Sequence, residues 1–245
     1  MTALPGQATP RLLALDTASG RCSVALLAGE QLVLRAAGTA RGHAQLLLPM
    51  VDAVLAETGL TLPQLDGIAF GRGPGSFTGL RIAAGVTQGL AAGSGLPVLP
   101  VSDLRALALS AGATLAGPGP HWLLACMDAR MGELYWGLFQ GDGGFVGDAA
   151  GGERLSPPAA LAAELGGLLP AGAVIAAAAG KGLAACPELG TRLELDAAHC
   201  LERAEPHAAQ IARLAVRDLA AGASWLDAAA AQPVYLRDSV AQQPL

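Results

Sequence analysis

Two aspartates stand where acidic side chains could hold a metal–nucleotide complex. Asp16 follows the apolar residues 13–15, and Asp128 follows the apolar residues 125–127, at a constant offset of 112 positions. If the two strand ends face each other across a cleft, their carboxylates could bind a divalent cation and its phosphates. Alternatively, each aspartate only stabilises the turn after it by accepting hydrogen bonds from its own backbone. Both interpretations stay open on these residues alone.

The segment 71–79 is rich in glycine and lies between a predicted strand and a predicted helix. Its glycines would let the backbone approach a ligand or a neighbouring chain closely, and the helix start offers N–H groups to an anion. It is not a P-loop, because no lysine follows it and the single lysine is Lys181. It is not a nucleophile elbow, because Pro74 occupies the first glycine position around Ser76. The alternative is a tight strand-to-helix turn.

Histidines and cysteines do not have the spacing of a metal site or of an activated nucleophile. His43 could open an HxxxH motif, but Leu47 occupies the position of the second imidazole. His199 and His207 are too far apart to lie on adjacent helical turns, and the four cysteines form no CxxC pair. The sequence therefore displays no active site, and this favours a binding role.

Apolar periodicity and turn residues predict the elements that position these groups. The predicted strands of the first half are residues 12–15, 22–27, 31–36, 66–70 and 97–101, and its helices are 43–58, 78–92 and 103–111, the last capped by Ser102. After a linker-like stretch at 117–120 the opening recurs, with Gly20 matching Gly132 and Leu26 matching Leu138. A glycine-rich loop (141–152), a helix (about 158–165), a strand (173–177) and a helix (about 206–221) follow.

This repeated order predicts two α/β halves with mixed sheets. We expect a flexible lead over residues 1–10, a first domain over 11–116 and a second over 117–245, whose helix at about 206–221 could pack back on the first.

Two helices of the first half carry more apolar and small residues than contact with one sheet requires. Residues 43–58 present a wide stripe of Leu, Met and Val, and residues 78–92 present Gly and Ala four positions apart. Packing of both helices on their own sheet would account for either stripe alone. Together, in a chain without evident catalytic groups, they favour a helix-mediated subunit interface.

Composition excludes several classes of protein. The 245 residues are 52% hydrophobic and 14% charged, which excludes a disordered chain. No apolar run reaches the length of a membrane span, and the start lacks the features of an export signal, so we expect a cytoplasmic protein without a membrane partner. The net charge of −5 and the absence of basic runs disfavour a protein that grips nucleic acid by itself.

Several motifs together resemble those of the TsaB (YeaZ) family, bacterial accessory subunits for threonylcarbamoyladenosine formation in tRNA. They are Leu15-Asp16-Thr17-Ala18 with residues 22–26, His43 with Gln45 and Leu48-Pro49, and the runs at 71–81, 127–135 and 233–237. The resemblance covers about residues 11–240 in the same order. It implies the actin/Hsp70/sugar-kinase (ASKHA) fold, with two RNase H-like halves facing a cleft.

The resemblance also implies a non-catalytic platform that dimerises with the catalytic paralogue TsaD, joined by the ATPase TsaE. In that family TsaD transfers the threonylcarbamoyl group from its adenylate to adenosine beside the anticodon, in tRNAs reading codons that begin with A. We therefore expect no intrinsic cofactor, with ATP and metal on partner subunits and tRNA held mainly by partners. The isolated chain could also form a homodimer.

Site residues follow from the same match. The expected docking residues are His43, Leu47, Met50, Val51, Val54, Phe77, Leu80, Arg81, Ala84 and Gly85. The expected cleft and motif residues are Asp16, Thr17, Arg72, Gly73, Gly75, Ser76, Asp128 and Arg130. Kinase-type members of the fold have small residues after each hairpin aspartate, whereas this chain has Thr17-Ala18 and Ala129-Arg130, which disfavours nucleotide binding in its cleft.

Two other functions stay open. The first is an ATP-dependent phosphotransferase of the same fold that uses Asp16 and Asp128. The second is a metalloendopeptidase, a label attached to related sequences, which the missing metal ligands disfavour.

Overall fold

The first half of the chain forms a five-stranded mixed sheet. The computed structural model describes residues 9–38, 42–117, 119–142, 144–185, 189, 193 and 195–237. The sheet has the order β3-β2-β1-β4-β5, with β1 antiparallel to β2 and parallel to β4. Its strands are β1 Leu12–Asp16, β2 Arg21–Ala28, β3 Gln31–Gly38, β4 Gly67–Gly71 and β5 Val98–Val101. β1 and β4 are buried along their whole lengths, so both read as continuous apolar runs.

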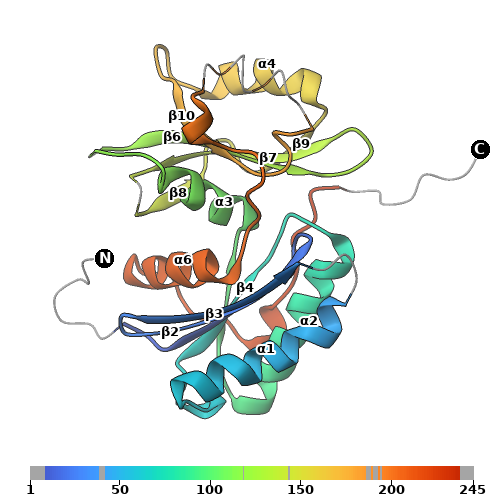
Figure 1. The fold of residues 1–245 in the computed structure, drawn as a ribbon, viewed down its shortest axis with the longest axis vertical. Helices are drawn as coiled ribbons and strands as arrows, with labels where there is room; N and C mark the ends of the chain where they lie inside the picture. Colours follow the sequence, from blue (N-terminus) through green and yellow to red (C-terminus); the bar gives the residue numbers. More distant parts are fainter. Residues whose placement is uncertain are drawn as a thin grey trace, which may run out of the picture.

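Two helices, α1 His43–Thr58 and α2 Phe77–Ser94, cover one face of this sheet (Figure 1). The buried Leu47, Val51 and Val54 of α1 pack in a core cluster with residues of β1, β2 and β4. Both helices end at glycines with positive φ, Gly59 at 67° and Gly95 at 70°, a conformation that glycine adopts without steric cost. A short 3-10 helix, η1 Leu62–Gln64, connects α1 to β4.

The second half repeats the plan of the first. Its sheet has the order β8-β7-β6-β10-β11, in which β6 pairs antiparallel with β7 and parallel with β10, while β9 also pairs with β7. The strands are β6 His121–Asp128, β7 Leu134–Gly141, β8 Val146–Ala149, β9 Arg154–Ser156, β10 Ile175–Ala179 and β11 Cys200–Leu201. The same order in both sheets confirms the predicted α/β fold of two RNase H-like halves.

The helix α4 Pro158–Leu168 packs with the outer core cluster of the second sheet. The predicted glycine-rich loop over 141–152 contains a strand that was not predicted from the sequence: β8 forms within it, Val146 is buried and the strand pairs with β7.

Two helices lie between the sheets and join the halves (Figure 1). α3 Asp103–Gly112 follows β5 of the first sheet but packs against β6, β7 and β10 of the second. Conversely, α6 Ala208–Ala220 follows β11 but packs against β1, β2 and β4. Both helices share one core cluster with residues of the two sheets, so the central core belongs to neither half alone.

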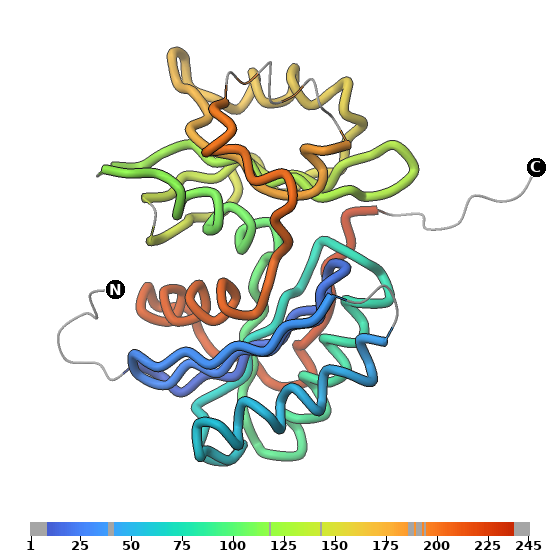
Figure 2. The backbone as a smooth tube through the Cα atoms, in the orientation of Figure 1, coloured from blue at the N-terminus to red at the C-terminus, as the bar shows by residue number. Residues whose placement is uncertain are grey.

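Directly after α6 the chain runs along the first half before its last described residues turn toward the second (Figure 2). Leu226 forms a bridge with Val98 of β5, and η3 Ala228–Ala230 contacts α2. A further 3-10 helix, η2 Ala197–His199, precedes β11. Of the expected lead, residues 1–8 lie outside the described part. Within the described ranges, no helix is long and apolar enough to cross a membrane.

Candidate functional site

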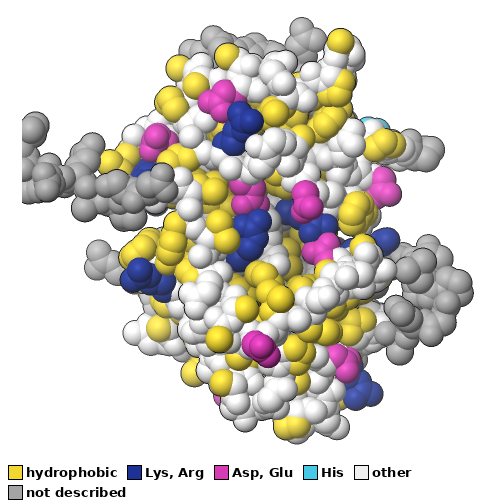
Figure 3. All heavy atoms as spheres, turned by 180° about the vertical axis from the view of Figure 1, so that it is seen from behind, with side chains coloured by type: hydrophobic (Ala, Val, Ile, Leu, Met, Phe, Trp, Pro, Cys, Tyr) yellow, Lys and Arg dark blue, Asp and Glu magenta, His cyan; other side chains and the backbone are white. Residues whose placement is uncertain are grey.

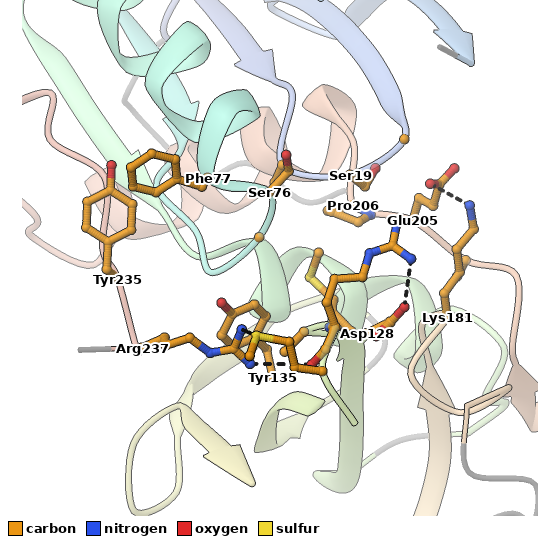
Figure 4. A pocket seen from close by; sticks show the side chains of 18 of the residues that line it. Ser19, Ser76, Phe77, Asp128, Tyr135, Lys181, Glu205, Pro206, Tyr235 and Arg237 are labelled. Carbon is orange, nitrogen blue, oxygen red and sulfur yellow. Dashed lines mark hydrogen bonds and ion pairs between the residues drawn. The ribbon is translucent and has the colours of Figure 1, made fainter. Parts of the chain in front are cut away.

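A cavity of about 750 Å³ opens between the two halves. The first half contributes the β1–β2 turn, His43 at the start of α1 and the segment before α2. The second half contributes the β6–β7 turn together with Lys181 and Glu205, and the C-terminal segment adds Tyr235 and Arg237 (Figure 4). Its volume is that of a small-molecule site.

Ion pairs occupy much of the polar lining of this cavity. Asp128 pairs with Arg130 at 3.3 Å, and Glu205 pairs with Lys181 at 2.8 Å and with Arg21 at 3.6 Å. Burial alone would raise the pKa of Glu205, but the hydrogen bond from Lys181 and the charges of Lys181 and Arg21 lower it. Glu205 is therefore ionised at neutral pH.

Asp16 does not line the cavity, so the expectation that it faces Asp128 was wrong. Its side chain is fully buried, and Oδ1 accepts a hydrogen bond from Ala18 N at 2.7 Å. The carboxyl faces that of the fully buried Asp103, with which it hydrogen-bonds when one of the two is protonated, and Asp103 Oδ2 accepts from Gly73 N at 2.6 Å. The physical reason is that β1 ends inside the core, where the first turn of α3 meets it.

Burial controls the protonation of this carboxyl pair. It raises the pKa of Asp16 to about 7, and burial together with the charge of Asp16 raises the pKa of Asp103 well above its ordinary value. The two groups therefore share a proton near neutral pH and act as a structural link between β1, the segment after β4 and α3. Across the described ranges, no group of three or more His, Cys, Asp or Glu side chains is placed to hold a metal ion.

The glycine-rich segment approaches its own chain rather than an open site. A Cβ at Gly79 would lie 1.9 Å from Thr17 O, and a Cβ at Gly75 would lie 2.5 Å from Ala18 O. Thr17 Oγ1 donates to Gly79 O at 2.7 Å, which holds the segment on the β1–β2 turn. The helix start is capped by Ser76, whose Oγ accepts from Gly79 N at 3.4 Å. These contacts favour the tight-turn interpretation over an anion loop.

Arg72 and Gly73 help to connect the two halves. Arg72 pairs with Glu153 of the second half at 3.2 Å, and Ser102 donates a hydrogen bond to the same carboxylate. Gly73 has a φ of 108° and is buried against Leu80 and the backbone of Val234. Neither residue lines the cavity, so their motif is structural in this fold.

The C-terminal segment 233–237 crosses from one half to the other. Val234 N donates to Arg72 O at 2.7 Å, and the Tyr235 ring lies 5.4 Å from the ring of Phe77. Arg237 pairs with Glu133 of the second half. Sequence reasoning recognised this segment as a motif but did not assign Tyr235 or Arg237 to the site, because only folding brings them to the cavity.

The expected docking residues divide into two groups. Leu47, Val51, Val54, Leu80 and Ala84 are buried in the core of their own half, and His43 is nine-tenths buried, so these six predicted docking side chains are not available on the surface of the isolated chain. The apolar stripe of α1 packs against the sheet of its own half. Phe77, Arg81 and Gly85 are exposed, and Met50 is half-buried.

The outer faces of α1 and α2 are nevertheless open and poor in charge. Leu48 of α1 is 46% exposed. On α2, Gly85, Gly89 and Gly93 lie at four-residue spacing with open space around each. Small side chains at this spacing would let another helix approach closely.

Comparisons with known proteins give a consistent picture. Residues 37–245 match the family described as TsaD, tRNA N6-adenosine threonylcarbamoyltransferase. The chain is 36% identical to the tRNA threonylcarbamoyladenosine biosynthesis protein TsaB of Escherichia coli, over 96% of this chain and 98% of that protein. TsaB of Haemophilus influenzae is 49% identical over 51% of this chain, which spans about half (52%) of that protein. The solved structure of YeaZ from Pseudomonas aeruginosa is 40% identical with a TM-score of 0.80, covering 93% of this chain and 100% of that chain.

Proposed function

The chain belongs to the TsaB (YeaZ) family of tRNA threonylcarbamoyladenosine biosynthesis proteins, and we propose that it acts there as a non-catalytic subunit that pairs with TsaD. TsaD would then transfer the threonylcarbamoyl group to adenosine next to the anticodon of tRNAs that read codons starting with A. The ATPase TsaE would join the pair, with ATP and metal on these partners. This activity belongs in the cytoplasm, where tRNA is found.

The arrangement of the cavity supports a non-catalytic role. Asp16, the group that a phosphotransferase of this fold would need beside Asp128, is buried against Asp103. Asp128 itself forms an exposed ion pair with Arg130. The phosphotransferase alternative thus loses one of its two carboxylates, and no described cluster of side chains favours the metalloendopeptidase alternative.

The observation that carries the proposal is the open outer face of α1 and α2, which we call the docking face: Leu48, Gly85, Gly89 and Gly93 with the half-buried Met50. A glutamate introduced there would be buried unpaired in the complex, at a cost of several kcal/mol, or more than a hundredfold in affinity. Because these positions are exposed, the variants should fold normally in isolation.

Co-purification with the cognate TsaD subunit tests the proposal. We expect Leu48→Glu and Gly89→Glu to abolish co-elution on size exclusion, whereas Val174→Glu retains it. Val174 is a matched control because it is an exposed aliphatic residue on the second half, at 74% exposure. Undiminished binding by both docking-face variants would remove the proposed interface. Modification of an unmodified tRNA by the other components, with and without this chain, then tests the function itself.

A further inference from the structure

Aromatic, cationic and Met side chains gather at the mouth of the cleft cavity, and we call them the mouth cluster: Phe77, Arg81, Arg130, Met131, Tyr235 and Arg237. Figure 4 shows three of them, Phe77, Tyr235 and Arg237, beside one another. The Arg81 guanidinium lies 4.0 Å from the centre of the Phe77 ring, and its Nε donates to Tyr235 Oη at 3.1 Å. Phe77, Met131 and Tyr235 are 39%, 58% and 42% exposed, and they are three of the six large hydrophobic side chains exposed in the described ranges. Exposed rings beside guanidinium groups offer stacking surfaces as well as positive charge.

The β6–β7 turn adopts a costly backbone conformation at this mouth. Arg130 and Met131 have φ values of 63° and 56°, and Gly132 follows at 75°. Glu133 N donates to Arg130 O at 3.1 Å, so the chain reverses here in a tight turn. Asn, Asp or Gly would adopt this conformation more readily than Arg or Met. The turn therefore holds two long side chains at the cavity at the expense of local stability.

Positive charge exceeds negative charge around the cavity, although the whole chain carries −5. Arg130, Lys181 and Arg237 line it, against Asp128 and Glu205. Their neighbours add Arg21 and Arg81 against Glu133. In the view of Figure 3, both basic and acidic side chains gather at the level where the two halves meet. This local excess of basic groups favours an anionic ligand at the cavity.

His43 provides an unsatisfied polar group on the wall of the cavity. The residue is nine-tenths buried, and its Nδ1 has no hydrogen-bond partner within the described ranges. Burial lowers the pKa of His43, so the ring is neutral and can accept or donate one hydrogen bond. A buried polar atom without a partner requires an explanation, and a ligand or a water molecule in the cavity would supply one.

From these observations we infer that the mouth cluster binds an unpaired stretch of RNA, with a base against Phe77 and Tyr235 and phosphate groups near Arg81 and Arg130. Unstacked bases have free faces for aromatic stacking, whereas the bases of a duplex do not. The inference rests on the proposed function, which brings a tRNA to the complex. It assigns to this chain a direct RNA contact beyond its docking role.

The test measures the affinity of a fluorescein-labelled, unmodified tRNA transcript by anisotropy, for the full chain alone and in complex with its TsaD partner. Tyr235→Ala removes a stacking ring and Arg130→Gln removes a phosphate partner, and both lie outside the docking face. Tyr235→Phe keeps the ring, and Arg35→Gln removes a distant arginine of β3. Co-elution with TsaD is measured on the same samples.

We expect Tyr235→Ala and Arg130→Gln each to weaken tRNA binding about tenfold. Arg130→Gln should also reduce the slope of log affinity against log salt by about 0.7. Tyr235→Phe and Arg35→Gln should match the wild type. Equal affinity for all four variants would overturn the inference. So would a competition experiment in which AMP displaces the tRNA at the same concentration as an oligonucleotide does.

The proposed function fails separately, through loss of co-elution of the wild-type chain with TsaD. In that case the anisotropy measurement of tRNA binding to the chain alone still tests the RNA contact by the same criteria.

Discussion

Replacing Asp103 by asparagine should make the protein more stable at neutral pH. In the wild type, the folded chain holds a proton between Asp16 and Asp103 that the unfolded chain, with ordinary carboxyl pKa values, has released at pH 7. Burial raises the pKa of both carboxyls, so folding at pH 7 takes up a proton, and this uptake costs stability. The amide of the Asp103→Asn variant could donate to Asp16 in place of the shared proton while its oxygen still accepts from Gly73 N, so this proton uptake is avoided.

The sign of the pH dependence follows from the raised pKa. Because the folded state binds the extra proton, the contribution of this pair to stability is greatest at acidic pH and falls by about 1.4 kcal/mol per pH unit as the pH rises toward 7. Asp103→Asn should remove this slope. Its free energy of unfolding should equal that of the wild type near pH 4 and exceed it by about 2–4 kcal/mol at pH 7.

Urea unfolding of both proteins between pH 4.5 and pH 7.5 measures the difference. Asp103→Ala serves as the comparison, because it leaves Gly73 N without its acceptor and should destabilise at every pH. The double variant Asp16→Asn/Asp103→Asn places two amides in contact without a shared proton and should lose the gain. Parallel pH profiles for the wild type and Asp103→Asn would refute the shared proton.

Three further predictions concern the packing of the halves. Leu47→Glu buries an unpaired charge in the first core, so we expect little or no folded protein on expression, measured by circular dichroism, rather than a folded protein that fails to dock. Gly79→Ala forces a Cβ onto a backbone carbonyl and should lower the melting temperature, whereas Gly93→Ala in the same helix has open space and should raise stability by about 0.5–1 kcal/mol in urea unfolding. Arg105→Ala breaks the largely buried ion pair with Asp218 and should lower the free energy of unfolding by about 3–5 kcal/mol in the same assay. Arg35→Ala breaks the exposed pair with Glu57 and should cost less than about 1 kcal/mol. Equal costs for the two variants would contradict this ranking.

The local elements could be predicted because periodicity and capping residues mark them. The helices over 43–58 and 103–111 agree with the structure to within one residue, and Ser102 accepts a hydrogen bond from Arg105 N as a helix cap does. β8 could not be predicted because it is only four residues long and lies within a glycine-rich stretch. Its formation depends on pairing with β7.

The site was less predictable because burial decides which side chains reach it. The sequence marks Asp16 and Asp128 as equivalent ends of repeated hairpins, and the repeat is real in the sheet order. Their environments differ, since α3 begins beside the end of β1 and seals Asp16 from the cavity. The apolar stripe of α1 likewise does not distinguish the sheet-facing Leu47 from the exposed Leu48, which are neighbours in sequence.

The exchange of α3 and α6 between the two sheets means that neither repeat is a self-sufficient folding unit. A fragment ending near residue 117 would keep the first sheet but lose α6, leaving the sheet face beneath that helix open to water. The remaining fragment would lack α3, so the face of the second sheet that this helix covers would also be exposed to water. Cleavage at the repeat boundary would therefore yield two fragments that each expose apolar surface and that would re-associate with each other. The two repeats thus fold as one unit.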